Sequence, residues 1–363
     1  MNPASAGTRG ENGGLVSRRD LEAFACTVLA RIGLPLTASS VVAEQLVEAD
    51  LAGCYSHGVA LLPWYEELVT SGDMDPAAET EVLWERGAMV GLDGHNGVGQ
   101  VCATLASELA IRRAQEHGIS CVLGRNAGHL GRLGHFTTRI ARAGCGSVLT
   151  INYQGGMQTI APYGALDARL SNDPISIGAP SRDAPVVADM ALSAAARVKI
   201  DAAGERCRPI PEGWVMDADG KPSTDPGALE RGGTMLPLGG LVAGHKGYGL
   251  LVLIDILTGL LSGGGACNGP PTEQFSNAFC LIAIDVAHAT RRGDFEAEVE
   301  AFRAYVKSAR RRPGGQEILF PGELETSAAE RQEREGISLD RHIWGELGAL
   351  ARRLEIPLPH ALP

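Results

Sequence analysis

Apolar residues recur at helical spacing near both ends of the chain, and shorter apolar runs lie between them. The pattern predicts helices over about 17–32, 39–51 and 62–71, and again over 295–308, 325–336 and 340–354. Gly53 lies two residues after the second predicted helix and Gly72 directly follows the third, as is common at helix ends. Between these terminal regions, strand-like runs at 88–93, 120–123, 146–152, 175–177, 186–189 and 279–285 alternate with helical stretches at 100–117, 136–143, 192–200 and 247–261.

This order predicts a mixed sheet-and-helix core flanked by helices from both termini. We expect residues 17–80 and 290–363 to pack together as a helical lobe, and residues 81–289 to form a sheet domain that binds a cofactor. Residues 1–16, which carry no apolar periodicity, are expected to be a disordered N-terminus.

Composition narrows the function classes. The net charge is −11 (32 Lys+Arg against 43 Asp+Glu) and aromatic residues make up 5%, which argues against a nucleic-acid binder and favours small-molecule partners. No apolar run reaches the ~20 residues that cross a bilayer, and the N-terminus lacks the apolar core of a signal peptide. The eight cysteines are scattered without a CxxC motif, so we expect free thiols in a reducing cytoplasm.

Two histidine motifs carry candidate chemistry. His57 follows Ser56 and precedes Gly58 in a loop between two predicted helices, and an imidazole there could exchange a proton at neutral pH. A surface or capping histidine is the alternative. His129 lies in a glycine-rich segment after a predicted strand, but its G-x-x-G-x-x-G spacing is not the dinucleotide fingerprint. Together with His135 it lacks the further ligand that a zinc site needs, so we predict no metal.

Two further loops are candidate anion or ribose sites. Five glycines fall within residues 239–249, and Lys246 adds a positive charge where this loop enters a helix. A tight turn with an exposed lysine is the alternative. Glu323, after Pro321 and Gly322, could meet ribose hydroxyls or cap the following helix.

In order and spacing, these motifs resemble the type 2 malate/L-lactate dehydrogenase family of NAD(P)-dependent oxidoreductases. That family includes ureidoglycolate and sulfolactate dehydrogenases, diketogulonate reductase and Δ1-piperideine-2-carboxylate reductase. The resemblance covers about residues 17–357 and rests on the segments 56–59, 72–76, 126–131, 161–164, 170–174, 187–190, 217–220, 224–226, 245–249 and 321–323.

The resemblance implies a fold that is not a Rossmann domain but a largely antiparallel sheet core with a helical lobe built from both termini. It implies homodimers with NAD or NADP bound near the dimer interface, and hydride transfer with a histidine, His57 or His129, moving the proton. Ser56 completes the predicted catalytic set, and Leu61, Tyr65 and Tyr153 are candidate substrate contacts. The candidate cofactor contacts are Gly131, Asp173, Asp189, Met190, Leu238, Gly239, Lys246, Gly247, Gly322 and Glu323.

The chain departs from the family pattern at several of these positions. Leu61 replaces an arginine suited to a substrate carboxylate, and Asp173 replaces an amide. Leu192 and Val198 replace a hydroxyl residue and a glycine. Loss of an arginine and gain of an acid would disfavour an anionic substrate and could favour an imine or amine.

Three readings follow. The first is an NAD(P)-dependent dehydrogenase or reductase of a small 2-oxo/2-hydroxy acid or cyclic imine. The second is a family member repurposed as a lyase or isomerase, which the departures keep open. The third, a catalytically silent homodimer, is disfavoured because His57, His129, Asp189 and Lys246 are retained.

Overall fold

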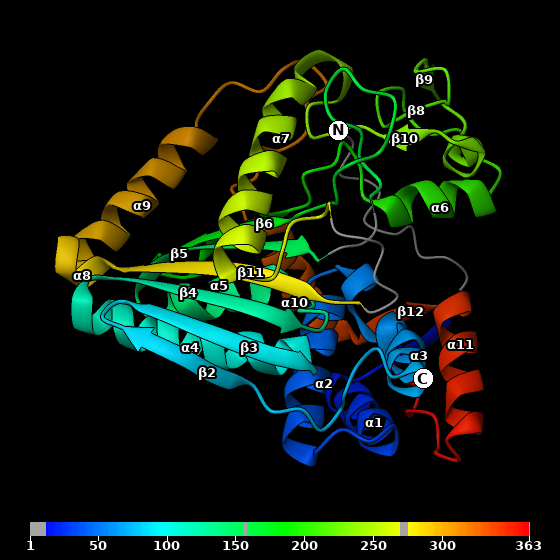
Figure 1. The fold of residues 1–363 in the computed structure, drawn as a ribbon, viewed down its shortest axis with the longest axis horizontal. Helices are drawn as coiled ribbons and strands as arrows, with labels where there is room; N and C mark the ends of the chain where they lie inside the picture. Colours follow the sequence, from blue (N-terminus) through cyan, green and yellow to red (C-terminus); the bar gives the residue numbers. More distant parts are fainter. Residues whose placement is uncertain (1–11, 155–157, 269–274, 363) are drawn as a thin grey trace.

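The computed structural model describes residues 12–154, 158–268 and 275–362. Its centre is a seven-stranded sheet in the order β2-β3-β4-β11-β5-β6-β7 (Figure 1). Only β3 and β4 pair in parallel within this sheet, and every other neighbour is antiparallel. This confirms a largely antiparallel, non-Rossmann core. The strands are β2 (Glu81–Arg86), β3 (Met89–Gly97), β4 (Ile119–Ala127), β5 (Cys145–Tyr153), β6 (Ile175–Ala179), β7 (Val186–Met190) and β11 (Asn277–Asp285).

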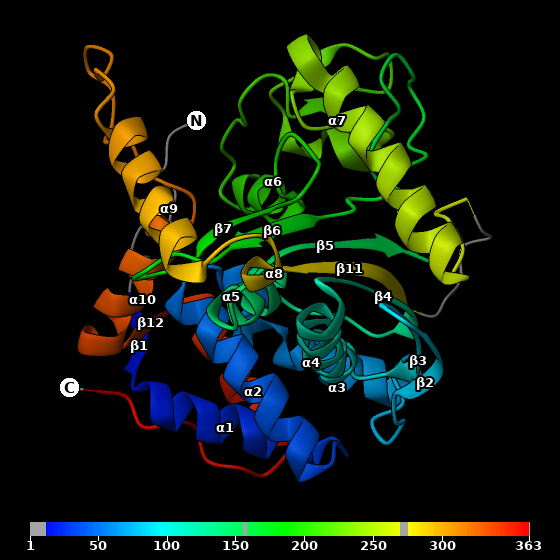
Figure 2. The same ribbon diagram turned by 90° about the vertical axis from the view of Figure 1, so that its left-hand side faces the viewer.

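One face of the sheet is covered by α4 (Gly99–His117) and α5 (Leu133–Arg142), as Figure 2 shows. Phe136 and Phe279 are fully buried between these helices and the strands. Gly124 on β4 must lack a side chain, because a Cβ there would stand 2.1 Å from the ring of Phe279. Side chains alternate in direction along each strand, so one set points into this core and the other set points to the opposite face of the sheet.

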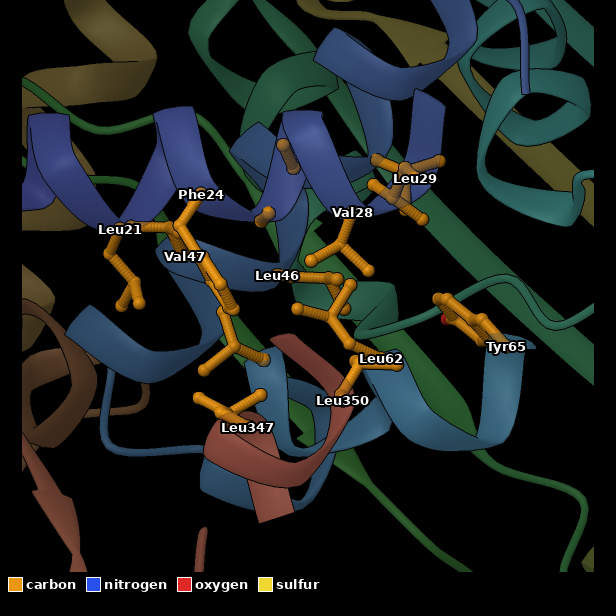
Figure 3. Packing of buried hydrophobic residues seen from close by; sticks show 14 of the residues in the cluster. Leu21, Phe24, Val28, Leu29, Leu46, Val47, Leu62, Tyr65, Leu347 and Leu350 are labelled. Atoms are coloured by element: carbon orange, nitrogen blue, oxygen red, sulfur yellow. The ribbon is translucent and has the colours of Figure 1, made fainter. Parts of the chain in front are cut away.

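The helical lobe unites both ends of the chain. Helices α1 (Arg18–Arg31), α2 (Leu36–Leu51) and α3 (Leu62–Ser71) pack with α11 (Arg341–Arg353), and Leu46, Leu62, Leu347 and Leu350 meet in the shared core (Figure 3). Helix α10 (Glu323–Glu335) joins them through α2.

The expectation that residues 1–16 are disordered is wrong for its last part. Residues Asn12–Val16 form strand β1, which pairs antiparallel with β12 (Ile337–Asp340), and Val16 is fully buried. The partner strand lies more than 300 residues away, so the local sequence gives no sign of it. Residues 1–11 lie outside the described part of the chain.

A second core lies within residues 81–289. It is formed by a small sheet, by α6 (Arg197–Glu205) and by α7 (Gly240–Ile254), which runs on as a π-helix, η5 (Asp255–Leu260). The predicted helix at 192–200 therefore begins later, and the one at 247–261 begins earlier. Leu192 lies before α6 and is fully buried in this core. The small sheet contains β8 (Val215–Met216), β9 (Pro222–Ser223) and β10 (Thr234–Met235), with the 3-10 helix η4 (Pro226–Arg231) beside it.

Helix α9 (Arg292–Lys307) does not join the helical lobe, although the sequence grouped residues 290–363 there. It follows the short α8 (Val286–Ala289) and lies beside the β6–β7 end of the sheet (Figure 2), where Arg303 donates to Ser181 Oγ at 3.2 Å. None of its residues is buried. A helix pattern with an apolar stripe does not say which neighbour the stripe will face.

Of the described residues, Gly240–Leu260 is one helical segment long and apolar enough to cross a membrane by length and composition, with 33% of its window buried. The side of this segment that faces the sheet is hydrogen-bonded to β5. The Thr258 and Thr150 hydroxyls lie 2.7 Å apart, and Asn152 donates to Asp255 at 2.7 Å. The segment is thus part of the folded core on one side.

Candidate active site

The fold brings together the two histidines that the sequence singled out. His57 ends the 3-10 helix η2 (Tyr55–His57) in the helical lobe, and His129 follows β4 of the central sheet. Their rings are stacked, with centroids 5.8 Å apart and planes inclined by 22°. The candidate site therefore lies where the helical lobe meets the end of the sheet.

Aromatic side chains enclose His129. The hydroxyl of Tyr65 lies 2.8 Å from His129 Nδ1, and the rings of Trp64 and Phe275 approach the imidazole at 5.3 and 6.0 Å. Tyr153 contacts Phe275 edge-on at 4.6 Å. Both tyrosines predicted as substrate contacts thus lie in the histidine's surroundings, while Trp64 and Phe275 were missed because nothing in their local sequence marks them.

The surroundings of the two histidines keep both imidazoles neutral. Burial lowers the pKa of His129 to about 3, with a smaller contribution from His57. Burial, then the charge of Arg132, lowers the pKa of His57 to about 4. Ser56, which is exposed, places its hydroxyl 3.0 Å from His57 Nδ1. At neutral pH both rings are therefore uncharged.

A buried carboxyl supports the His57 loop from below. Asp50 is fully buried on α2, and its Oδ2 accepts a hydrogen bond from the backbone N–H of Val59 at 2.8 Å. Gly58 passes so close that a Cβ there would collide with the Asp50 carboxyl. Burial raises the pKa of Asp50 to about 8, which the Val59 bond only partly offsets. The Ser56-His57-Gly58 loop thus rests on a protonated, uncharged side chain at neutral pH.

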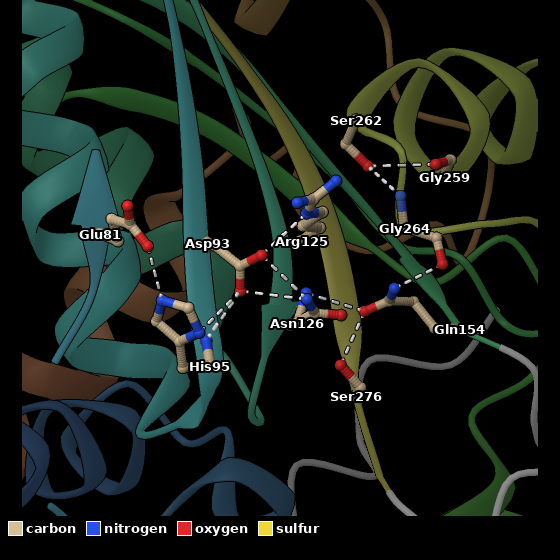
Figure 4. A network of polar contacts seen from close by, with 10 residues as sticks. All are labelled: Glu81, Asp93, His95, Arg125, Asn126, Gln154, Gly259, Ser262, Gly264 and Ser276. Atoms are coloured by element: carbon tan, nitrogen blue, oxygen red, sulfur yellow. Dashed lines mark hydrogen bonds and ion pairs between the residues drawn. The ribbon is translucent and has the colours of Figure 1, made fainter. Parts of the chain in front are cut away.

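A polar network fixes the strand end that leads to His129 (Figure 4). Asn126 adopts a left-handed backbone conformation with φ of 49°, which costs free energy for a residue with a side chain. Its side-chain amide donates to Asp93 at 3.0 Å, and its backbone N–H donates to Gln154 Oε1 at 3.0 Å. Arg125 also donates to Asp93, at 2.9 Å. These contacts offset the strain and set the direction of the chain toward His129.

Arg132 is the functional candidate that sequence reasoning missed. It lies three residues after His129, its charge acts on His57, and its Nε is 3.9 Å from Asp189 Oδ2. The backbone N–H of Gly134 donates to the same oxygen at 2.7 Å. The adjacent histidine and glycines were visible in the sequence, but only the fold brings this guanidinium close enough for its charge to act on His57.

Most predicted cofactor contacts gather along the edge strand β7. Asp189 and Met190 end this strand, and Met190 is 41% exposed. Leu238 bonds through its N–H to Leu192 O at 2.8 Å, just beyond β7, and Pro321 accepts from Val187 N at 3.4 Å. Gly239 and Gly322 are the N-caps of α7 and α10, both with positive φ, and neither helix has a side-chain cap.

The other predicted contacts have structural partners of their own. Gly247 lets α7 approach the preceding loop, because a Cβ there would stand 2.4 Å from Leu238 O. Gly131 has φ of 74° and packs against Gln100. Lys246 is exposed on α7. Glu323 accepts from Phe320 N at 3.0 Å and from Lys307 at 2.7 Å, so its carboxylate is already paired within the protein.

Asp173 and Leu61 do not lie as the departures from the family pattern suggested. Asp173 is 2% exposed and accepts a hydrogen bond from Ser171, and burial raises its pKa to about 7. Leu61 is partly buried against the core of the helical lobe. Neither residue therefore presents a new charge to an open ligand surface, and Arg132 supplies a cation beside His57.

Comparison of the whole sequence with known proteins is consistent with an active site of this kind. A family model described as malate/L-lactate dehydrogenase matches residues 16–348. The chain belongs to the malate/L-lactate dehydrogenase family. It is 33% identical to a malate dehydrogenase of Pyrococcus horikoshii, covering 94% of this chain and 96% of that one. It is 33% identical to an L-lactate dehydrogenase of Cupriavidus necator, covering 96% and 99%.

Solved structures share the fold. The structure of the P. horikoshii malate dehydrogenase superposes with a TM-score of 0.88 at 30% identity, covering 98% of this chain and 99% of that one. A Δ1-piperideine-2-carboxylate reductase from Pseudomonas syringae superposes with a TM-score of 0.82 at 26% identity, covering 93% and 99%. Relatives named as dehydrogenases, and a reductase among the structures, make this family member an oxidoreductase.

Proposed function

We propose that this protein transfers hydride between NAD or NADP and a small 2-oxo/2-hydroxy acid or cyclic imine, with a histidine as proton donor or acceptor. The observation that carries the proposal is the stacked, neutral pair His57 and His129 beside the Arg132 guanidinium. Oxidising a hydroxyl requires a group that accepts its proton, and a neutral imidazole at pH 7 meets that need.

Arg132 is assigned to the substrate. The relatives named for malate, lactate and piperideine-2-carboxylate all act on compounds that carry a carboxylate. A guanidinium is the side chain best suited to hold a carboxylate, because its donors can pair with both oxygens. Arg132 can do this without Leu61, the position where the family resemblance expects an arginine.

The nicotinamide cofactor fits the β7 edge. Backbone amides at an uncapped helix N-terminus attract phosphate, and α7 begins at Gly239 and Gly240 with no side-chain cap. Lys246 stands within the first two turns of this helix and adds positive charge. When bound there, the cofactor would supply the hydride acceptor or donor, while residues of this chain bind the phosphates and move the proton.

The test is a titration with NADH and NADPH, followed by a panel of keto acids and cyclic imines. Tryptophan quenching or a raised melting temperature is expected with at least one of the two cofactors. Oxidation of the bound cofactor, followed by its absorbance, should then accompany reduction of a carboxylate-bearing substrate. Absence of binding by both cofactors contradicts the proposal, and binding without any redox turnover would favour a lyase or isomerase.

We further propose that two copies of this chain pair through the sheet face that carries α7. Ser176 bonds to Thr137 of α5 at 2.7 Å, so its strand neighbour Ile177 points to the opposite face, where it is 45% exposed. The outer side of α7 and η5 is apolar as well, and α9 buries none of its residues. Exposed residues of this surface are Ile119, Ile177, Ile284, Leu250, Leu253, Leu257 and Leu260.

Exposed apolar side chains gathered on one face mark an interaction site. Sedimentation equilibrium should show a dimer, and Leu253→Lys should shift the protein toward a monomer, whereas Leu36→Lys, an exposed leucine (72%) on α2, should not. A wild-type monomer at micromolar concentration, or flotation with lipid vesicles instead of dimerisation, would contradict the pairing.

A further inference from the structure

The residues behind His129 form a short hydrogen-bonded chain. Gln100 is 1% exposed on α4, and its side-chain amide nitrogen donates to the hydroxyl of Tyr65 at 2.5 Å. Tyr65 is 2% exposed on α3, and the same hydroxyl lies 2.8 Å from His129 Nδ1. The three residues come from α4, α3 and the segment after β4, so only the tertiary fold joins them.

The direction of these two hydrogen bonds follows from which groups can donate and which can accept. An amide N–H can only donate, so the Tyr65 oxygen is the acceptor in its contact with Gln100. Within the described residues, the remaining hydrogen-bond partner of the Tyr65 hydroxyl is His129 Nδ1. A buried hydroxyl proton left without an acceptor costs about 1–3 kcal/mol, so the proton points to Nδ1, which must then be unprotonated.

Building on the proposed function, we propose that Gln100 and Tyr65 are positioning residues that lock His129 in the tautomer with its proton on Nε2. In that state His129 donates a hydrogen bond to the reacting oxygen or nitrogen of the substrate and keeps its own proton. His57, whose Nδ1 lies 3.0 Å from the exposed Ser56 hydroxyl, is the ring that takes the proton. In the oxidation direction the substrate O–H bond breaks and a new N–H bond forms on His57, while a bound NAD or NADP would supply the acceptor for the carbon-bound hydrogen as hydride.

The two histidines differ in the way this assignment requires. A second proton on His129 would sit on Nδ1 and face the Tyr65 hydroxyl, which would have to turn its own proton toward the Gln100 amide. The ring of His129 is also packed against Trp64 and Phe275, which offer no hydrogen-bond acceptor in place of Tyr65. His57 has no comparable constraint, because a serine hydroxyl can rotate to donate or to accept.

A single isosteric substitution should reverse the direction of the hydrogen bonds that run from Gln100 through Tyr65 to His129. In Gln100→Glu the carboxylate can only accept, so the Tyr65 proton turns toward it and the Tyr65 oxygen then accepts from His129 Nδ1–H. Nitrogen-15 NMR of the ligand-free protein labelled at histidine separates the two tautomers, with the His129 signals assigned by their loss in His129→Asn. Wild type should show an unprotonated Nδ1 at pH 7, and Gln100→Glu should show a protonated one.

The control substitution introduces a buried carboxylate at a position that has no hydrogen bond to Tyr65. Gln45 is 4% exposed on α2 and donates to Thr104 at 3.3 Å, so Gln45→Glu should leave the His129 tautomer unchanged. Tyr65→Phe, which removes the hydroxyl and keeps the ring, should give a mixture of both tautomers and serves if Gln100→Glu does not fold. With an active substrate, Gln100→Glu should lower kcat at least tenfold while the cofactor dissociation constant changes less than twofold.

The NMR result does not depend on cofactor binding or turnover. A protonated Nδ1 in the wild-type protein, or an unchanged tautomer in folded Gln100→Glu, overturns the lock even if the redox function is confirmed. Conversely, failure of NADH and NADPH to bind would refute the proposed function and leave the tautomer measurement intact.

Discussion

The two sides of the candidate site are built in contrasting ways. On the histidine side, defined by His57, His129 and Tyr65, side chains from η2, α3 and the distant segment after β4 meet through ring contacts and hydrogen bonds in a largely buried setting. On the β7 side, defined by Met190, Leu238 and Gly322, backbone hydrogen bonds set the positions and side chains such as Met190 face solvent.

This difference separates two kinds of effect. A buried side chain held by several partners loses its geometry when one partner changes, so substitutions on the histidine side should act on turnover. Backbone amides at helix N-termini survive most side-chain changes, so substitutions on the β7 side should act weakly and mainly on cofactor affinity. Three predictions test this division, from the largest expected effect to the smallest, and a fourth tests the protonation of the buried carboxyl beneath the His57 loop.

Substitution of His57 should give the largest loss of turnover. His57→Asn is expected to lower kcat roughly 100- to 10,000-fold, because proton transfer then falls to water. Cofactor affinity, measured by fluorescence titration, should change less than twofold. His117→Asn, a histidine exposed at the end of α4, is the control. Equal turnover in His57→Asn and wild type would remove His57 from the mechanism.

Arg132→Met should follow, with KM for a carboxylate-bearing substrate raised about 10- to 100-fold by loss of a charge-assisted pair. Removing the positive charge should also raise the pKa of His57, visible as a shift of the pH–rate profile toward higher pH. Arg139→Met, a more exposed arginine of α5 paired with Glu108, should change neither quantity. An unaltered KM would mean that another group holds the carboxylate.

Lys246→Met tests the β7 side. An exposed lysine near a phosphate contributes a screened charge, so the cofactor dissociation constant should rise only about three- to tenfold, and less at high salt. Because backbone amides do the rest of the binding, kcat at saturating cofactor should stay within twofold of wild type. Lys221→Met, in the exposed turn between β8 and β9, is the matched control. A large loss of kcat would show that the two sides are not separable in this way.

Asp50→Asn should affect stability rather than affinity. The folded-state pKa of about 8 lies above the ordinary value of 3.8, so the folded protein holds a proton that the unfolded chain releases. Its contribution therefore falls as pH rises from about 4 to 8, and Asn, which cannot ionise, should flatten the decline. Urea unfolding at pH 5 and pH 8 measures this, with Asp219→Asn, an exposed aspartate, as control. An equally steep pH dependence in Asp50→Asn would contradict a protonated Asp50.

Much of the fold was accessible from local sequence. Helices α1, α2, α3, α4 and α11 were predicted to within a few residues, because their apolar spacing and their caps are local signals. Strand β1, the split of residues 81–289 into two cores and the place of α9 were not. Each of these depends on which distant segment supplies the partner, and pattern alone does not name partners.

The residues of the candidate site also divide into those that the local sequence indicated and those that it did not. The histidines were visible because loop glycines surround them, and Tyr65 and Tyr153 lie in their surroundings. Arg132 was passed over and Asp173 misread as a charge at an open ligand surface, because neither the direction of a side chain nor its burial can be read from its neighbours in sequence.

By itself, the sequence determined the family, most helices near the two ends of the chain and the residue types that can move a proton, since spacing and side-chain chemistry are local properties. The tertiary structure decided which groups surround those residues. Burial sets the protonation of His57, His129 and Asp50, and the contacts of Tyr65 and Gln100 set which ring nitrogen carries hydrogen. Protonation and hydrogen-bond direction depend on desolvation and on partners far apart in the chain, and only folding supplies these.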